Sequence, residues 1–256
     1  MNQYAFDRSW GQEDERLTAV ERQLDPVSQA AVDQLGLAAG WRCWEVGAGR
    51  GSMARWLAGR VGSGGSVVAS DIDVGPLTGL QHDNITVVGH DLEREGVPGG
   101  GFDLIHARLV LEHLKAPAAA AAKLASALAA GGWLVLEDAD GLGFDAEPPV
   151  KALSAITGPW HQAALAAGWD PLYGRQLVTD LHAAGLDQVA GRAHRSYQHG
   201  GDAWAGTRLG LQRMGDQIRH AGASCADLDE ALAALADPAR IILGAPIVTA
   251  WGRRTS

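Results

Sequence analysis

The sequence predicts an α/β fold built on a seven-stranded, mostly parallel sheet with helices on both faces and a helical cover insertion. Two observations support this prediction. From about residue 41, short apolar runs that end in an acidic residue or a glycine alternate with longer stretches rich in Ala and Leu. This alternation is typical of βα units that feed a parallel sheet. The runs are nearly continuous in apolar character, as expected of strands covered on both faces.

Each element has its own local signal. The seven predicted strands cover residues 41–46, 66–70, 85–88, 102–107, 133–137, 188–197 and 247–251. Asp25-Pro26 has the pattern of an N-cap followed by proline at the first helical position, and Gly131-Gly132 ends an alanine-rich helix over 118–130. Two further helices are predicted over 52–60 and 175–184.

The chain is predicted to form a single domain over residues 1–256. Its core spans 40–140, preceded by an N-terminal helix within 1–24 in which Tyr4 or Trp10 could close over a site. Residues 140–172 break the strand-helix rhythm with several glycines and prolines, and 201–240 again favour helix. We expect these two segments to form a helical cover.

Composition excludes several classes of function. Thirty acidic residues against 21 basic ones give a formal charge of -9, which argues against a nucleic-acid partner. No apolar run is long enough for a membrane span. Cys43 and Cys225 lie far apart, have no metal-ligand spacing and do not suggest a disulfide framework. With no secretory signal pattern, we expect a cytoplasmic protein without a metal site.

The most informative segment is the glycine loop that follows the first predicted strand. It places Gly47, Gly49 and Gly51 after an acidic residue, Glu45, at a strand-to-helix junction. Glycines there let the backbone turn tightly and approach a ligand closely. A dinucleotide fingerprint would have its third glycine at position 52, which is a serine. The spacing therefore disfavours a nicotinamide dehydrogenase.

Carboxylates end the next two predicted strands. Asp71 follows the loop by twenty residues, the distance at which an acid can accept both ribose hydroxyls. Asp73 competes for this role, but Asp71 is nearer the strand end. Asp91 ends the third strand, within reach of an adenine amino group. Three consecutive strands that end in ligand-type carboxylates predict a nucleoside-containing cofactor.

With these motifs, residues 40–140 resemble the class I S-adenosylmethionine (SAM)-dependent methyltransferases, particularly the small-molecule branch related to the ubiquinone and menaquinone enzymes. The resemblance implies a Rossmann-like sheet and SAM as cofactor. After the fourth strand, methyltransferases of nucleic bases and glutamine carry an Asn or Asp followed by Pro-Pro and an aromatic residue. Here that place reads His106-Ala107-Arg108-Leu109. The difference favours a small-molecule acceptor and no nucleic acid.

The resemblance also implies roles for individual residues. Glu45, Gly47, Gly49 and Gly51 would form the first SAM loop, and Asp71 would hold the ribose with Ile72 packing on the adenine. Asp91 would bind the adenine amine and Leu92 would lie on the face of its ring. His106 and Ala107 would contribute backbone contacts to the cofactor.

The sequence gives weaker signals for the residues that would bind the acceptor or remove a proton from it. SAM supplies the electrophile, so positioning can provide most of the catalysis, and a base helps only if the acceptor must lose a proton. Histidine suits that task, and His161 and His113 are the candidates. The candidate acceptor contacts are Glu137, Trp160, Tyr173 and Arg175.

Two functions remain open. The first is SAM-dependent methyl transfer to a small, aromatic or apolar acceptor, as in specialised metabolism. The second is a SAM-binding protein that catalyses a non-methylating reaction, such as a cyclisation, or that binds SAM without turnover. Catalysis by positioning requires no diagnostic residue, so the sequence does not separate them.

Overall fold

The computed structural model describes residues 10–80, 82–141 and 143–255, and Tyr4 lies outside them. The chain forms two compact units. The first, here the sheet unit, contains residues 25–138, 174–192 and 248–255. The second, here the helical unit, contains residues 10–24, 139–173 and 193–247. The helical unit thus gathers described parts of all three segments predicted as cover.

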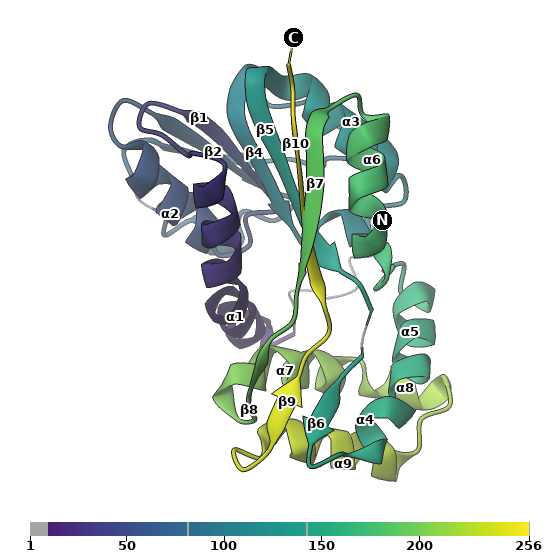
Figure 1. Cartoon of the computed structure of the whole chain (residues 1–256). Coiled ribbons are helices and arrows are strands. Elements are labelled where there is room, and N and C mark those ends of the chain that lie inside the picture. The colour runs from purple at the N-terminus through teal and green to yellow at the C-terminus, as the bar shows by residue number, and fades with distance from the viewer. Residues whose placement is uncertain (1–9, 81, 142, 256) are drawn as a thin grey trace. The chain divides into compact units, whose positions relative to one another are not determined.

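The sheet unit is built on seven strands in the order β3-β2-β1-β4-β5-β10-β7 (Figure 1). They are β1 (Arg42–Val46), β2 (Ser66–Asp71), β3 (Ile85–Gly89), β4 (Phe102–Arg108), β5 (Leu128–Ala139), β7 (Asp187–His194) and β10 (Ile247–Arg253). The pairs joining β3, β2, β1, β4 and β5 are all parallel. All seven predicted strands are present.

β10 runs against its neighbour β5. Gly131 and Gly132, near the start of β5, exchange backbone hydrogen bonds with Arg254, just after β10. Beyond the other end of β5, the Asp140 N–H donates to the Pro246 carbonyl, just before β10. Residue numbers rise along β5 where they fall along β10, so these two strands are antiparallel. The sheet is therefore mixed, with most strands parallel.

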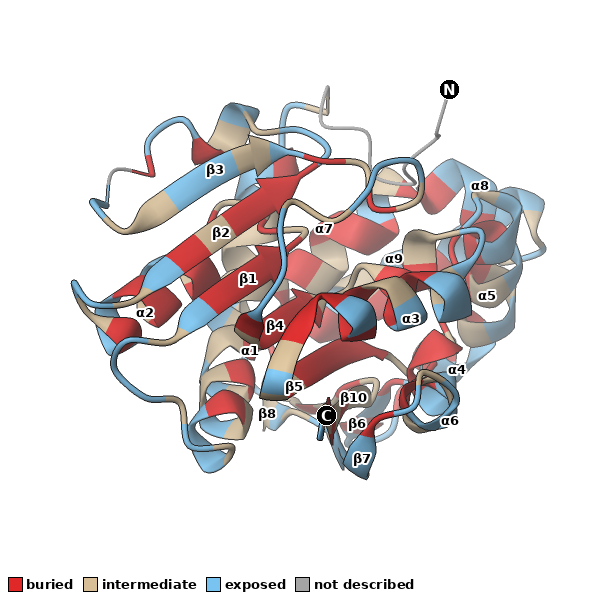
Figure 2. Cartoon of the chain, turned by 90° about the horizontal axis from the view of Figure 1, so that it is seen from above, coloured by how far each residue is buried: buried red, intermediate tan, exposed pale blue. Residues whose placement is uncertain are grey.

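Helices cover the sheet because the strands are apolar on both faces. Figure 2 shows the buried residues concentrated along β1, β4 and β5. α2 (Ser52–Val61) and Val32 of α1 (Glu13–Gln34) share one core with β1 and β2. α3 (Pro117–Ala127) and α6 (Leu177–Ala183) pack together on the opposite face (Figure 1).

Three predicted boundaries were wrong. α1 continues through Asp25-Pro26, because the Asp25 carboxylate accepts bonds from Ser52 and Arg108 and does not cap a new helix. α3 ends at Ala127, since Leu128 already pairs with Phe102 ahead of a register shift in β5. The predicted strand 188–197 is split, and Tyr197 belongs to a strand of another sheet.

The helical unit contains a small sheet that sequence patterns did not predict. Its strands, in the order β6-β9-β8, are all antiparallel to their neighbours: β6 (Asp145–Glu147), β9 (Ile241–Leu243) and β8 (Tyr197–His199). Its helices are α4 (Lys151–Ala155), α5 (Thr157–Ala166), α7 (Ala205–Arg213), α8 (Gly215–His220) and α9 (Cys225–Ala236). Strands of three residues are too short to show a recognisable alternation.

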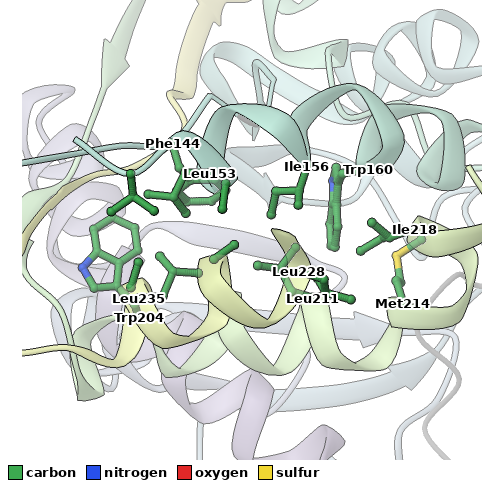
Figure 3. Packing of buried hydrophobic residues seen from close by; sticks show 14 of the residues in the cluster. Phe144, Leu153, Ile156, Trp160, Trp204, Leu211, Met214, Ile218, Leu228 and Leu235 are labelled. Carbon is green, nitrogen blue, oxygen red and sulfur yellow. The ribbon is translucent and has the colours of Figure 1, made fainter. Parts of the chain in front are cut away.

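The helices of this unit enclose one apolar cluster (Figure 3). Trp160 and Trp169 meet edge to face, with ring centroids 5.4 Å apart, and Phe144 meets Trp204 in the same manner. All four rings are buried. Among the described residues, no helix combines the length and the apolar character needed to cross a membrane.

Candidate functional site

The glycine loop connects β1 to α2 in a conformation that its glycines permit. Gly47, Gly49 and Gly51 all have positive φ, between 56° and 82°. A Cβ on Gly47 would lie 2.4 Å from Val110 Cγ2, so a side chain there would clash. A Cβ on Gly49 would have no heavy atom within 4 Å. The loop is therefore packed against the protein at Gly47 and open at Gly49.

Asp71 binds this loop from the end of the neighbouring strand, β2. One carboxylate oxygen accepts the Gly49 N–H at 2.9 Å, and the other accepts the Asp73 N–H at 3.0 Å. Asp73 instead accepts the N–H of Gly75, one turn further along the chain. Asp71 thus contacts the glycine loop directly.

The remaining candidates for the adenosine part of a cofactor lie in the same unit. Ile72, directly after β2, is 59% exposed, which is unusual for a large apolar side chain. The Asp91 carboxylate accepts the N–H groups of Glu93 and Arg94, and Leu92 is buried. The structure therefore places Asp71 at the carboxyl end of β2, Ile72 directly after it, and Asp91 just after β3.

A buried charged triad spans three neighbouring strands. Glu45 on β1 lies directly opposite His106 on β4, and Glu137 lies on β5. His106 Nδ1 is 2.7 Å from Glu45 Oε2, and His106 Nε2 is 3.2 Å from Glu137 Oε2. All three side chains are almost completely buried. The sequence marked each of them as a candidate, but it did not predict that they meet.

The hydrogen bonds continue from Glu137 into α1 and β10. Glu137 Oε1 accepts the Thr249 hydroxyl at 2.6 Å, and Oε2 also accepts the Ser28 hydroxyl. Arg108 Nη1 donates to Ser28 Oγ at 2.9 Å, and its Nη2 donates to Asp25 Oδ1 at 2.8 Å. We call these residues, with the triad, the strand-end network. Sequence reasoning missed Asp25, Ser28 and Thr249, because contacts across the fold leave no local pattern.

Within the triad, His106 and Glu137 have pKa values shifted toward their charged forms. Burial alone would lower the pKa of His106, but the charge of Glu45 and the hydrogen bonds to both carboxylates outweigh it and raise the pKa to about 9. Burial favours the neutral form of Glu137, yet the hydrogen bond and charge of His106, helped by Arg108, lower its pKa to about 2. Both shifts favour an imidazolium at His106 and a carboxylate at Glu137 near neutral pH.

A second group of acids lies beside the network. Asp138 is fully buried, and its Oδ2 accepts no hydrogen bond from the described part of the chain. Burial and the nearby charge of Glu112 raise the pKa of Asp138 well above its usual range. Glu112 Oε1 lies 3.5 Å from His113 Nε2. His113, a predicted base candidate, therefore has an acidic neighbour.

The other acceptor and base candidates are divided between the two units. Trp160, His161 and Tyr173 belong to the helical unit, where Trp160 is part of the apolar core and Tyr173 is also buried. His161 is half-buried on α5. Arg175 belongs to the sheet unit and is exposed. Within the described ranges, no group of three His, Cys, Asp or Glu side chains could hold a metal ion.

The sheet order and the glycine loop between β1 and α2 define a Rossmann-like α/β protein. Comparison with known proteins specifies the family. A family model described as "Methyltransferase domain" matches residues 18–190, more than half of the chain. The chain belongs to this family of methyltransferase domains.

A curated relative gives a second match. "Methyltransferase str2" from Strobilurus tenacellus is 32% identical over 149 residues, which cover 55% of this chain and 51% of the relative. The chain thus spans about half the length of that protein.

Solved structures show the same fold at low identity. A phosphoethanolamine N-methyltransferase 2 from Haemonchus contortus, in complex with phosphomonomethylethanolamine and S-adenosylhomocysteine, aligns with a TM-score of 0.65 and 13% identity, covering 100% of this chain and 61% of its own. A SAM-dependent methyltransferase from Aquifex aeolicus aligns with a TM-score of 0.50 and 14% identity, covering 88% of each chain. The predicted Rossmann-like fold is confirmed.

Proposed function

We propose that this protein is a SAM-dependent methyltransferase acting on a small, aromatic or apolar acceptor of specialised metabolism. The observation that carries the proposal is the contact between Asp71 and Gly49, which joins the acid at the end of β2 to the glycine loop after β1. In a member of a methyltransferase family, this pairing supports a site for the adenosine and methionine parts of SAM. The assignment to the ubiquinone and menaquinone branch also remains a proposal.

The residues present suit such a cofactor. Open space at Gly49 lets a ligand approach the loop backbone closely. The exposed side chain of Ile72 offers an apolar surface beside Asp71 for an adenine ring. Asp71 would hold the ribose hydroxyls, and Asp91 with Leu92 would bind the adenine. Ala107, buried on β4, would contribute a backbone contact.

SAM, when bound, supplies a methyl group on a positively charged sulfur, which is the electrophile of an in-line displacement. The protein then has to bind SAM and the acceptor, orient them and exclude water. Orientation of the reactants contributes roughly 7–11 kcal/mol in well-aligned systems. His113 and His161 remain our candidates for removing a proton from the acceptor. His113 is the better supported, because Glu112 beside it would stabilise the charged imidazole.

We assign the contacts to the acceptor from the chemical character of the candidate side chains. Trp160 and Tyr173 would contribute aromatic surface, and Arg175 would pair with an acidic group. Glu137 is 1% exposed and already binds His106, Ser28 and Thr249, so we assign it to the strand-end network in preference to the acceptor. The formal charge of -9 supports a small-molecule partner in place of nucleic acid, and a cytoplasmic location remains our expectation.

Calorimetry with SAM tests the cofactor site. Asp71→Ala should weaken binding by about 1.5–3 kcal/mol, the range for hydrogen bonds to a charged group. Asp73→Ala is the matched control, because it removes the same kind of carboxylate two residues away, where the Gly75 N–H is bound instead of the glycine loop. Equal losses in the two variants, or no loss in Asp71→Ala, would refute the assignment. Circular dichroism verifies that both variants fold.

Turnover separates the two functions left open by the sequence. The protein is incubated with methyl-labelled SAM and a panel of phenols, hydroxy acids and amines. Methyl transfer yields labelled product together with S-adenosylhomocysteine. A product formed without S-adenosylhomocysteine would instead show a non-methylating reaction, and tight SAM binding with no product from any acceptor would favour a binding module.

A further inference from the structure

The strand-end network holds more negative than positive charge. Glu45, Glu137 and Asp25 are carboxylates, whereas His106 and Arg108 are the cations that bind them. With His106 as the imidazolium, these five groups carry a formal charge of -1, and their side chains are at most 19% exposed. An uncompensated buried charge is costly unless a counter-charge approaches it. A cationic group of a ligand would supply this counter-charge.

Glu45 is where the excess charge is available. Its Oε2 is bound by His106 Nδ1, and its Oε1 accepts no hydrogen bond from the described part of the chain. Both oxygens of Glu137 have protein donors, and Asp25 Oδ1 receives Arg108 and Ser52. Glu45 also stands two residues before Gly47, where the glycine loop begins. A cationic group of a ligand at the loop would meet Glu45 Oε1.

We propose that His106 is a positioning residue for the cofactor: held between Glu45 and Glu137, it aims the second oxygen of Glu45 at the ammonium group of the cofactor's methionine part. This inference rests on the proposed function, since it takes SAM as the ligand. His106 itself makes no contact with the ligand through its ring, because both ring nitrogens are engaged by carboxylates.

The rest of the network keeps His106 in place. Glu137 is fixed by Thr249 from β10 and by Ser28 from α1. Ser28 in turn accepts from Arg108, whose other nitrogen is held by Asp25. The imidazole is therefore bound on one side to a carboxylate that Thr249 and Ser28 hold in place. Among the ring's partners in the described part of the chain, Glu45 is the one with an oxygen left for a ligand.

Two ligands distinguish this role from a merely structural one. S-adenosylhomocysteine carries the ammonium group, whereas 5′-methylthioadenosine has the same adenosine but lacks the amino-acid part. By calorimetry, His106→Gln should weaken S-adenosylhomocysteine about tenfold, as expected for misplacing a charge-assisted bond, and leave 5′-methylthioadenosine unchanged. His82→Gln is the control: it is the same substitution at an exposed site before the edge strand β3, whereas His106 lies on the central strand β4.

A double-mutant cycle tests whether His106 acts through Glu45. Glu45→Gln should also weaken S-adenosylhomocysteine at least tenfold, and adding His106→Gln to it should cause no further loss. Independent, multiplying losses would overturn the proposal, as would wild-type affinity in Glu45→Gln. Equal losses for both ligands in His106→Gln would show a structural role only. If the wild-type protein binds neither ligand, the proposed function itself fails.

A measurement on the wild-type protein covers the case in which His106→Gln does not fold. In protein labelled with ¹⁵N-histidine, both ring nitrogens of His106 should show the shifts of an imidazolium at pH 7.5, where a solvent-exposed histidine is neutral. Addition of S-adenosylhomocysteine should move the Nδ1 signal, which faces Glu45, more than the Nε2 signal. A neutral ring, or a ring whose signals ignore the ligand, would overturn the proposal.

Discussion

The two units of the chain bury different kinds of side chain. The helical unit encloses an apolar cluster rich in tryptophan, and its buried ionisable side chains in the described ranges are Glu13 and Arg16, which pair with each other. The sheet unit buries Glu45, His106 and Glu137 at the ends of its strands. The contrast indicates where function is concentrated: buried charge is expensive and is kept where it binds something.

The largest expected effect is a loss of stability when the apolar cluster of the helical unit is disrupted. Trp160→Ala should lower the free energy of unfolding by about 3–5 kcal/mol, because it leaves a large cavity in the cluster of Figure 3. Leu165→Ala, on the same helix but 59% exposed, is the control and should change it by less than about 0.5 kcal/mol. Denaturant titration measures both. A small loss for Trp160→Ala would indicate a ligand wall instead of a core residue.

The next largest effect is a pH dependence of stability that comes from the buried charges of the sheet unit. The pKa of His106 is raised to about 9 in the folded protein, against 6.5 for the free side chain. Its contribution to stability is therefore fully present below about pH 6.5 and is lost as the pH rises through 9. Over this window, we expect the wild-type protein to lose about 2 kcal/mol relative to His106→Gln/Glu137→Gln, a double variant with the same formal charge in the triad.

Denaturant titrations at several pH values between 6 and 9.5 check this expectation. A constant difference between the two proteins would show that His106 is neutral or that its charge does not stabilise the fold. In the acid range the sign reverses for Glu137, whose lowered pKa stabilises the protein above about pH 4.5 and ceases to do so as the pH falls through 2.

The same comparison shows what sequence reasoning could reach. The apolar runs predicted all seven strands of the large sheet, and the glycines predicted the loop after β1, because these features are local. Trp160 was predicted as an acceptor contact, and the sequence did not show that its side chain packs in an apolar core. Asp25 was interpreted as a helix cap because a proline follows it in the sequence. Its real partners, Ser52 and Arg108, are remote in sequence, so only the fold reveals them.

The smallest effect sharpens the comparison within a single helix. Asp25 and Asp33 both lie on α1 and both pair with an arginine. The pair of Asp25 with Arg108 is mostly buried, with side chains 19% and 10% exposed, whereas the pair of Asp33 with Arg60 is 40% and 47% exposed. Asp25→Asn should therefore cost about 1 kcal/mol or more in unfolding free energy, and Asp33→Asn less than about 0.5.

The two substitutions are chemically identical, so the difference between them isolates burial and the link to the strand-end network. Raising the salt concentration from 0.05 to about 1 M should remove the effect of Asp33→Asn and leave most of that of Asp25→Asn, because solvent ions screen exposed pairs far more than buried ones. Equal losses with equal salt dependence would mean that the network ends at Ser28 and that Arg108 is not held by Asp25 in solution.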